Sequence, residues 1–96
     1  MRPRVYVDFN EMTNPDEVLL SRTDTKTDSH GNVVRFAEGL VVAVYMDDQD
    51  EQGNPDNLIA DGVAIRNTFS GWQASVPWVL KIDRRGVRRQ SEEPDA

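Results

Sequence analysis

The sequence predicts a small all-β domain, an antiparallel barrel or roll of five or six short strands. Over residues 72–82 apolar and polar side chains alternate without a break, which is the pattern of a half-buried β-strand. Glycine, proline, asparagine and aspartate recur about every dozen residues and mark turns between short strands. No segment continues a helical period. Short strands joined by frequent turns are typical of small curled sheets.

The first two strands are predicted near the N-terminus. Apolar residues alternate over residues 5–9 and leave Tyr6 on the outward face. A second strand is predicted over residues 18–22, because the threonine-rich run at 23–27 favours extended backbone. Residues 14–17 also have the form of a helix start, with an N-cap and a first-turn proline. A short helix over residues 14–22 therefore remains the alternative.

The central strands follow a turn at residues 28–32. A third strand is predicted over 33–36, and residues 40–46 form the most apolar run of the chain. Because alternate side chains of a strand point to opposite faces, Val41, Ala43 and Tyr45 lie opposite the core-facing side chains of that run. Residues 58–67 return as an antiparallel strand, in which Gly62 indicates a bulge or a sharp bend.

The last long strand, residues 72–82, places Trp72 and Trp78 on one face, which we assign to the core. Val79 lies on the opposite face. Pro77 lacks a backbone N–H, so this strand is predicted to be an edge strand or to kink and change partners. Val87 can add a short strand after a turn at residues 84–86, and residues 91–96 read as a disordered acidic tail.

Composition limits the domain organisation and the location. The chain has 96 residues, 38% of them hydrophobic, so residues 1–90 are expected to form one domain with one core. The absence of cysteine excludes disulfides, thiolate metal sites and a catalytic thiol. The net charge of −6 disfavours general attraction to nucleic acid or to an anionic membrane. With no long apolar stretch in the sequence, we expect a cytoplasmic protein.

Two segments carry a resemblance to a known architecture. They are Val5-Tyr6-Val7-Asp8-Phe9, and Gly71-Trp72 followed by Val76-Pro77-Trp78-Val79. The first resembles the aromatic and acidic opening strand of SH3-like small β-barrels, and the second resembles their later tryptophan and proline-aromatic segment. The resemblance implies a small barrel and concerns architecture alone, since it points to no single family.

The leading functional interpretation is a non-catalytic protein-interaction or accessory module. Its candidate patch consists of the side chains that alternation turns away from the core: Tyr6, Val41, Ala43, Tyr45 and Val79. The expected partner is another protein or a second copy of the chain, and we expect no cofactor and no small-molecule ligand. His30, the single histidine, lies beside a glycine in a predicted turn. Because no nucleophile or second ligand accompanies it, we read it as a surface residue.

The basic turn at residues 84–89 supports an alternative, contact with RNA. Its arginines are Arg84, Arg85, Arg88 and Arg89, and guanidinium groups pair well with phosphate. The turn contains no aromatic residue that could stack on bases. Such a segment is more commonly a solvated turn, or it pairs with acidic loops of its own chain.

The acidic loop at residues 47–56 supports a third interpretation, a weak calcium site. The candidate ligands are Asp48, Asp50 and Asp56, since Ca²⁺ prefers several oxygen ligands on a flexible loop. The spacing excludes an EF-hand, because Ile59 stands where that loop requires a glutamate. A solvated loop whose charge discourages aggregation accounts for the same residues.

Overall fold

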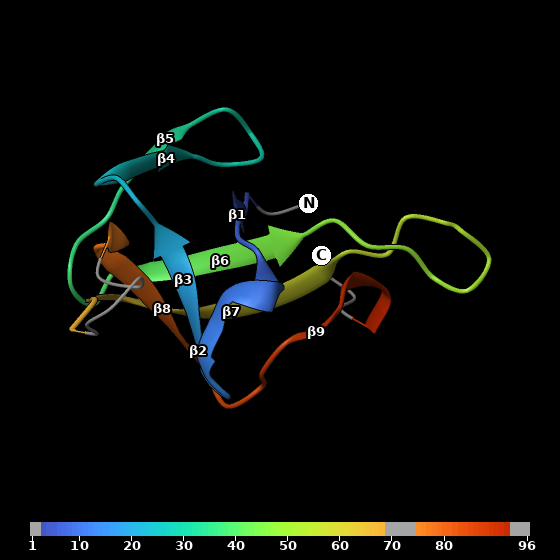
Figure 1. The fold of residues 1–96 in the computed structure, drawn as a ribbon. Coiled ribbons are helices and arrows are strands. Elements are labelled where there is room, and N and C mark those ends of the chain that lie inside the picture. Colours follow the sequence, from blue (N-terminus) through green and yellow to red (C-terminus); the bar gives the residue numbers. More distant parts are fainter. Residues whose placement is uncertain (1–2, 69–74, 93–96) are drawn as a thin grey trace.

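The computed structural model describes residues 3–68 and 75–92, and it confirms the all-β class. Its elements, drawn in Figure 1, are β1 (Val5–Tyr6), the 3₁₀ turn η1 (Phe9–Glu11), β2 (Met12–Asn14), β3 (Glu17–Ser21), β4 (Thr25–Thr27), β5 (Val33–Arg35), β6 (Val41–Met46), β7 (Leu58–Arg66), β8 (Trp78–Ile82), β9 (Arg88–Arg89) and the 3₁₀ turn η3 (Gln90–Glu92). No helix in these two ranges has the length and apolar character needed to cross a membrane.

The main sheet has seven strands in the order β1-β6-β7-β8-β3-β2, and β9 pairs with the beginning of β7. β1 lies parallel to β6, and all other neighbours are antiparallel, including the predicted β6–β7 pair. No pairing joins β1 to β2 or β3 within the described ranges. The sheet is therefore open, and the predicted closed barrel is not observed. The structure shares with SH3-like domains only the general property of being a small all-β domain.

One core joins the two ends of this sheet. Val18 and Leu20 of β3 pack in the same cluster as Val5 of β1 and Val44 of β6. In Figure 1, β3 crosses in front of β6, so the sheet folds over on itself around these side chains. Trp78 lies in the same core, as predicted, and is 2% exposed.

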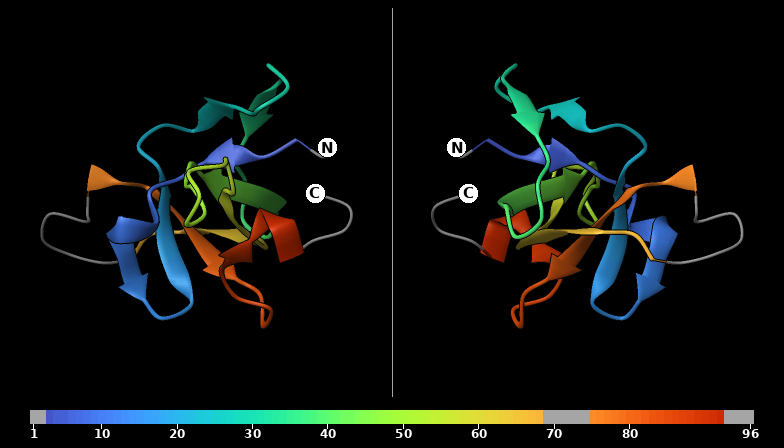
Figure 2. Two further views of the ribbon diagram at one scale, coloured as in Figure 1. Left: turned by 90° about the vertical axis from the view of Figure 1, so that its right-hand side faces the viewer. Right: turned by 90° about the vertical axis from the view of Figure 1, so that its left-hand side faces the viewer.

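The segment at residues 17–21 is a strand, so the helical alternative is wrong. β3 pairs with β8 on one side and β2 on the other, which gives its backbone the partners that a helix would have supplied internally. β4 and β5 form a separate two-stranded hairpin, which stands apart from the main sheet in Figure 2. Phe36, just after β5, contacts Trp78 at a ring-centroid distance of 6.1 Å and so fixes this hairpin to the core.

The position of β8 in the sheet and the burial of its residue Val79 both differ from what the sequence predicted. β8 is an interior strand between β7 and β3, and it begins at Trp78, so Pro77 lies just before the ladder and removes no hydrogen bond from it. Val79 is only 1% exposed, because it packs with Leu19 and Ile65 in a second small cluster on the reverse face. It therefore does not belong to an exposed patch. Of the predicted strand at 72–82, residues 72–74, Trp72 among them, lie outside the described ranges.

Gly62 marks a close approach of two strands and no bulge. The register runs without a shift past Gly62 on both sides, where it pairs with Val42 and Ile82. A Cβ at this position would overlap the carbonyl oxygen of Lys81 and lie 2.8 Å from its carbonyl carbon. Only glycine lets β7 and β8 come this close.

Candidate interaction surface and seam pocket

Four of the five predicted patch residues share one face of β1 and β6. The parallel register pairs Tyr6 with Tyr45, and their rings meet edge to face at a centroid distance of 5.5 Å. Ala43 and Val41 follow on the same side of β6 by strand alternation. Tyr6 is 42% and Val41 is 73% exposed, while Ala43 and Tyr45 are half-buried. We call Tyr6, Val41, Ala43 and Tyr45 the β1–β6 face.

An arginine cluster borders this face. Asp61, the cross-strand neighbour of Ala43, is buried. Its Oδ2 accepts hydrogen bonds from Nη2 of Arg85 and Nη2 of Arg88, each at 2.7 Å, and its Oδ1 lies 3.5 Å from Nη1 of buried Arg4. Three guanidinium groups thus surround one carboxylate and tie the C-terminal segment to β7.

Arg89 connects the same segment to the acidic loop. Its Nη1 donates to Oδ2 of Asp48 at 3.0 Å and to the backbone oxygen of Asp56 at 3.2 Å. Arg84 is exposed and forms no ion pair with a described residue. Three of the four arginines considered for RNA contact are therefore engaged with acidic groups of their own chain. Pairing of this turn within the chain was the alternative to RNA contact.

The acidic loop between β6 and β7 extends away from the sheet in Figure 1. Oδ1 of Asp50 accepts hydrogen bonds from the backbone N–H groups of Asn54 and Gln52, each at 2.9 Å, and these bonds lower the pKa of Asp50. Asp56 accepts from the backbone and the hydroxyl of Ser91. The three candidate calcium ligands thus face different protein donors. In residues 3–68 and 75–92 no three His, Cys, Asp or Glu side chains group as a metal site.

His30 lies where the sequence placed it, exposed in a turn. Its backbone N–H donates to Oδ1 of Asp28 at 2.9 Å, and Asn32 donates to the same oxygen. Asp28 therefore organises this turn, and His30 contributes only its backbone to it.

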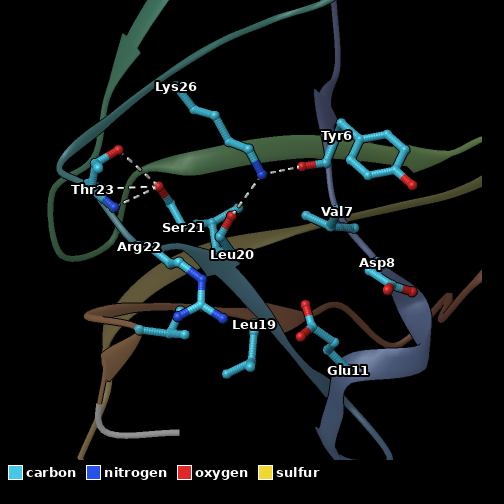
Figure 3. A pocket seen from close by; sticks show the side chains of 11 residues that line it. Tyr6, Val7, Asp8, Glu11, Leu19, Leu20, Ser21, Arg22, Thr23 and Lys26 are labelled. Carbon is cyan, nitrogen blue, oxygen red and sulfur yellow. Dashed lines mark hydrogen bonds between the residues drawn. The ribbon is translucent and has the colours of Figure 1, made fainter.

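A pocket of about 320 Å³ lies at the seam where β1 and β3 approach without pairing (Figure 3). Buried side chains of Val7, Leu19, Leu20 and Val76 form its apolar lining. The charged groups around it are Asp8, Glu11, Arg22 and Lys26. We call this cavity the seam pocket.

Lys26 spans the seam. Its Nζ donates to the backbone oxygen of Tyr6 in β1 at 2.5 Å and to that of Leu20 in β3 at 3.2 Å. Leu20 is the residue skipped in the β3–β8 register, so its carbonyl is available to the lysine. Partial burial lowers the pKa of Lys26, and the charge of Glu11 opposes that shift. The ammonium group therefore replaces the missing strand pairing with two hydrogen bonds.

Sequence reasoning did not identify the seam pocket. Its charged residues come from the segment after β1, the end of β3 and β4, and no motif links them. The one local signal is that Lys26 is the single basic residue of the threonine-rich run at residues 23–27, which does not indicate a partner.

Comparisons of the chain with models of protein families, with curated proteins and with solved structures find no match.

Proposed function

We propose that this chain is a non-catalytic domain that binds another polypeptide through the β1–β6 face. The observation that supports the proposal is the edge-to-face pair of Tyr6 and Tyr45 at the surface. Aromatic side chains held rigidly by a neighbour supply much of the binding energy in protein interfaces. Val41, 73% exposed two strand positions beyond Ala43, extends the apolar surface along β6.

A partner different from the chain itself fits the charge better than a second copy does. Each copy carries a net charge of −6, so two copies repel each other at low salt. Contact with RNA is less favoured as well. It would have to draw Arg85 and Arg88 away from the buried carboxylate of Asp61, which removes two of the three guanidinium groups that compensate this buried charge.

The proposal can be tested by replacing Tyr6 with a photoreactive benzoylphenylalanine and cross-linking in an extract of the cells that make the protein. Val33 offers a matched control, because it is 71% exposed but lies on β5. We expect a product with a distinct polypeptide from position 6 and none from position 33. The product should disappear with Val41→Glu and persist with Val33→Glu.

Sedimentation of the purified chain separates the two kinds of partner. We expect a monomer at micromolar concentration. A product at position 6 that survives Val41→Glu would overturn the proposed face, and a stable dimer that Val41→Glu dissociates would identify the partner as a second copy.

A further inference from the structure

The seam pocket holds opposite charges on opposite walls. In Figure 3 the carboxylate of Glu11 and the guanidinium group of Arg22 point into the same opening from the two sides. Nη1 of Arg22 donates to Oγ of Ser75 at 3.1 Å. Neither Glu11 nor Arg22 forms an ion pair with a described residue. The two charges therefore face each other across the cavity without neutralising each other.

Two further charged groups reinforce this separation. Asp8 lies on the same side as Glu11, with its carboxylate turned toward the backbone of Asn10, while Lys26 closes the top of the cavity. An ammonium group has three donors, and the carbonyls of Tyr6 and Leu20 take two of them. One donor of Lys26 is left for a ligand. The cavity thus has an acidic side, a basic side and an apolar lining.

We propose that the seam pocket binds a small zwitterion with an apolar body, the chemistry of a free aliphatic α-amino acid. The ligand carboxylate lies toward Arg22 and Lys26, the ammonium group lies toward Glu11, and the aliphatic side chain covers Leu19. A volume of about 320 Å³ suits a ligand of this size, because pockets for small molecules begin at about 300 Å³. Tyr6 of the β1–β6 face also lines this pocket, but the inference rests on the charged groups around the cavity and does not depend on the proposed protein-binding face.

The arrangement discriminates against ligands of a single charge. A ligand with only a carboxylate meets the repulsion of Glu11 and Asp8, and a ligand with only an ammonium group meets that of Arg22 and Lys26. Both penalties vanish when one ligand carries both charges in the matching order. Specificity for a zwitterion therefore follows from the placement of the charges.

The test uses leucine, N-acetyl-leucine, which lacks the cation, and leucinamide, which lacks the anion. Each compound is titrated into ¹⁵N-labelled protein, and the amide signals are followed by NMR. We expect saturable shifts at Leu20, Arg22 and Lys26 with leucine, and affinities on the order of tenfold weaker for the two blocked compounds. Absence of saturable shifts with leucine, or equal binding of all three compounds, would overturn the proposal.

Two charge-removing variants sharpen the test. Glu11→Gln and Arg22→Gln should each weaken leucine binding on the order of tenfold. Glu51→Gln and Arg35→Gln are their controls, because they remove the same charges at exposed positions outside the pocket. All four variants should keep the dispersed NMR spectrum of the folded protein, since none of these side chains lies in the core.

The two pocket variants should differ in which blocked compound they bind better, and this difference distinguishes specific recognition from a general effect of losing a charge. Glu11→Gln should bind N-acetyl-leucine more tightly than the parent protein does, because the repulsion of the ligand anion is gone. Arg22→Gln should do the same for leucinamide. If the controls weaken leucine binding as much as the pocket variants do, the site lies elsewhere and the proposal fails.

Discussion

Gly62→Ala tests the close approach of β7 and β8. The added Cβ would overlap the carbonyl oxygen of Lys81 and lie 2.8 Å from its carbonyl carbon and 3.0 Å from Cα of Ile82. All three are backbone atoms, so no change of rotamer can relieve the contact. β8 must move away from β7, although β3 holds it on the other side.

The expected loss follows from two opposing contributions. Overpacking a closely packed site typically costs about 1–3 kcal/mol, occasionally more. Replacing glycine by alanine stabilises the fold by about 0.5–1 kcal/mol, because alanine loses less backbone conformational entropy on folding. Because the obstacle is backbone on every side, the cost falls at the upper end of that range, so we expect a net loss of about 2–2.5 kcal/mol in the free energy of unfolding. A domain of this length has a total of about 5–15 kcal/mol.

Urea unfolding followed by tryptophan fluorescence measures the effect, with Gly31→Ala as the control. Gly31 has a φ of +83° and no atom within 4 Å of an added Cβ, so its substitution carries only the backbone cost of about 1–2 kcal/mol. The midpoint for Gly62→Ala should fall further than that for Gly31→Ala, at an unchanged dependence on urea. An equal or smaller fall for Gly62→Ala would refute the steric argument.

Three further outcomes can be measured in the same assay. Asp61→Asn should lower the free energy of unfolding by about 3–5 kcal/mol, because it removes the carboxylate among buried guanidinium groups; a loss below about 1 kcal/mol would contradict this role. Lys26→Met should cost about 1–2 kcal/mol, since two carbonyls lose a charged donor. Its control, Lys81→Met, should leave the midpoint nearly unchanged because Lys81 is exposed. Equal losses in the two variants would refute the bridging role of Lys26. Backbone hydrogen bonds lower the pKa of Asp48 and Asp50 below the usual 3.8, so the stability that these carboxylates contribute is complete above pH 3.8 and is lost as the pH falls through the lowered values. Asp50→Asn should therefore flatten the acid-induced fall of the midpoint, and an identical fall in both proteins would count against this assignment.

Sequence periodicity predicted the strands and much of the core. Alternation placed Trp78 inside and Tyr6 outside, and both are confirmed. The same rule placed Val79 on the surface, because alternation distinguishes the two faces of a strand but does not say whether the second face is covered. Val79 lies in an interior strand, where Leu19 and Ile65 cover it from the neighbouring strands.

Barrel closure could not be judged from local patterns. Apolar alternation continues to Phe9 in the sequence, yet β1 ends at Tyr6. Asp8 accepts a hydrogen bond from the backbone of Asn10 and starts a 3₁₀ turn, which interrupts the strand before the chain continues into β2 beside β3. The seam stays open at this turn, and Lys26 bridges it to carbonyls 20 and 6 residues away in the sequence, which no local pattern indicates.

The strand order has a consequence for biosynthesis. β3 depends on β8 for its long partner, and about 60 residues separate the two along the chain. While the ribosome is still translating the middle of the sequence, Leu19 and Leu20 have only the three-residue β2 beside their strand. An incomplete nascent chain thus exposes an unpaired apolar edge of the kind that chaperones bind. We therefore expect folding of this domain to wait until Trp78–Ile82 has left the ribosome, because β3 lacks its long partner until then.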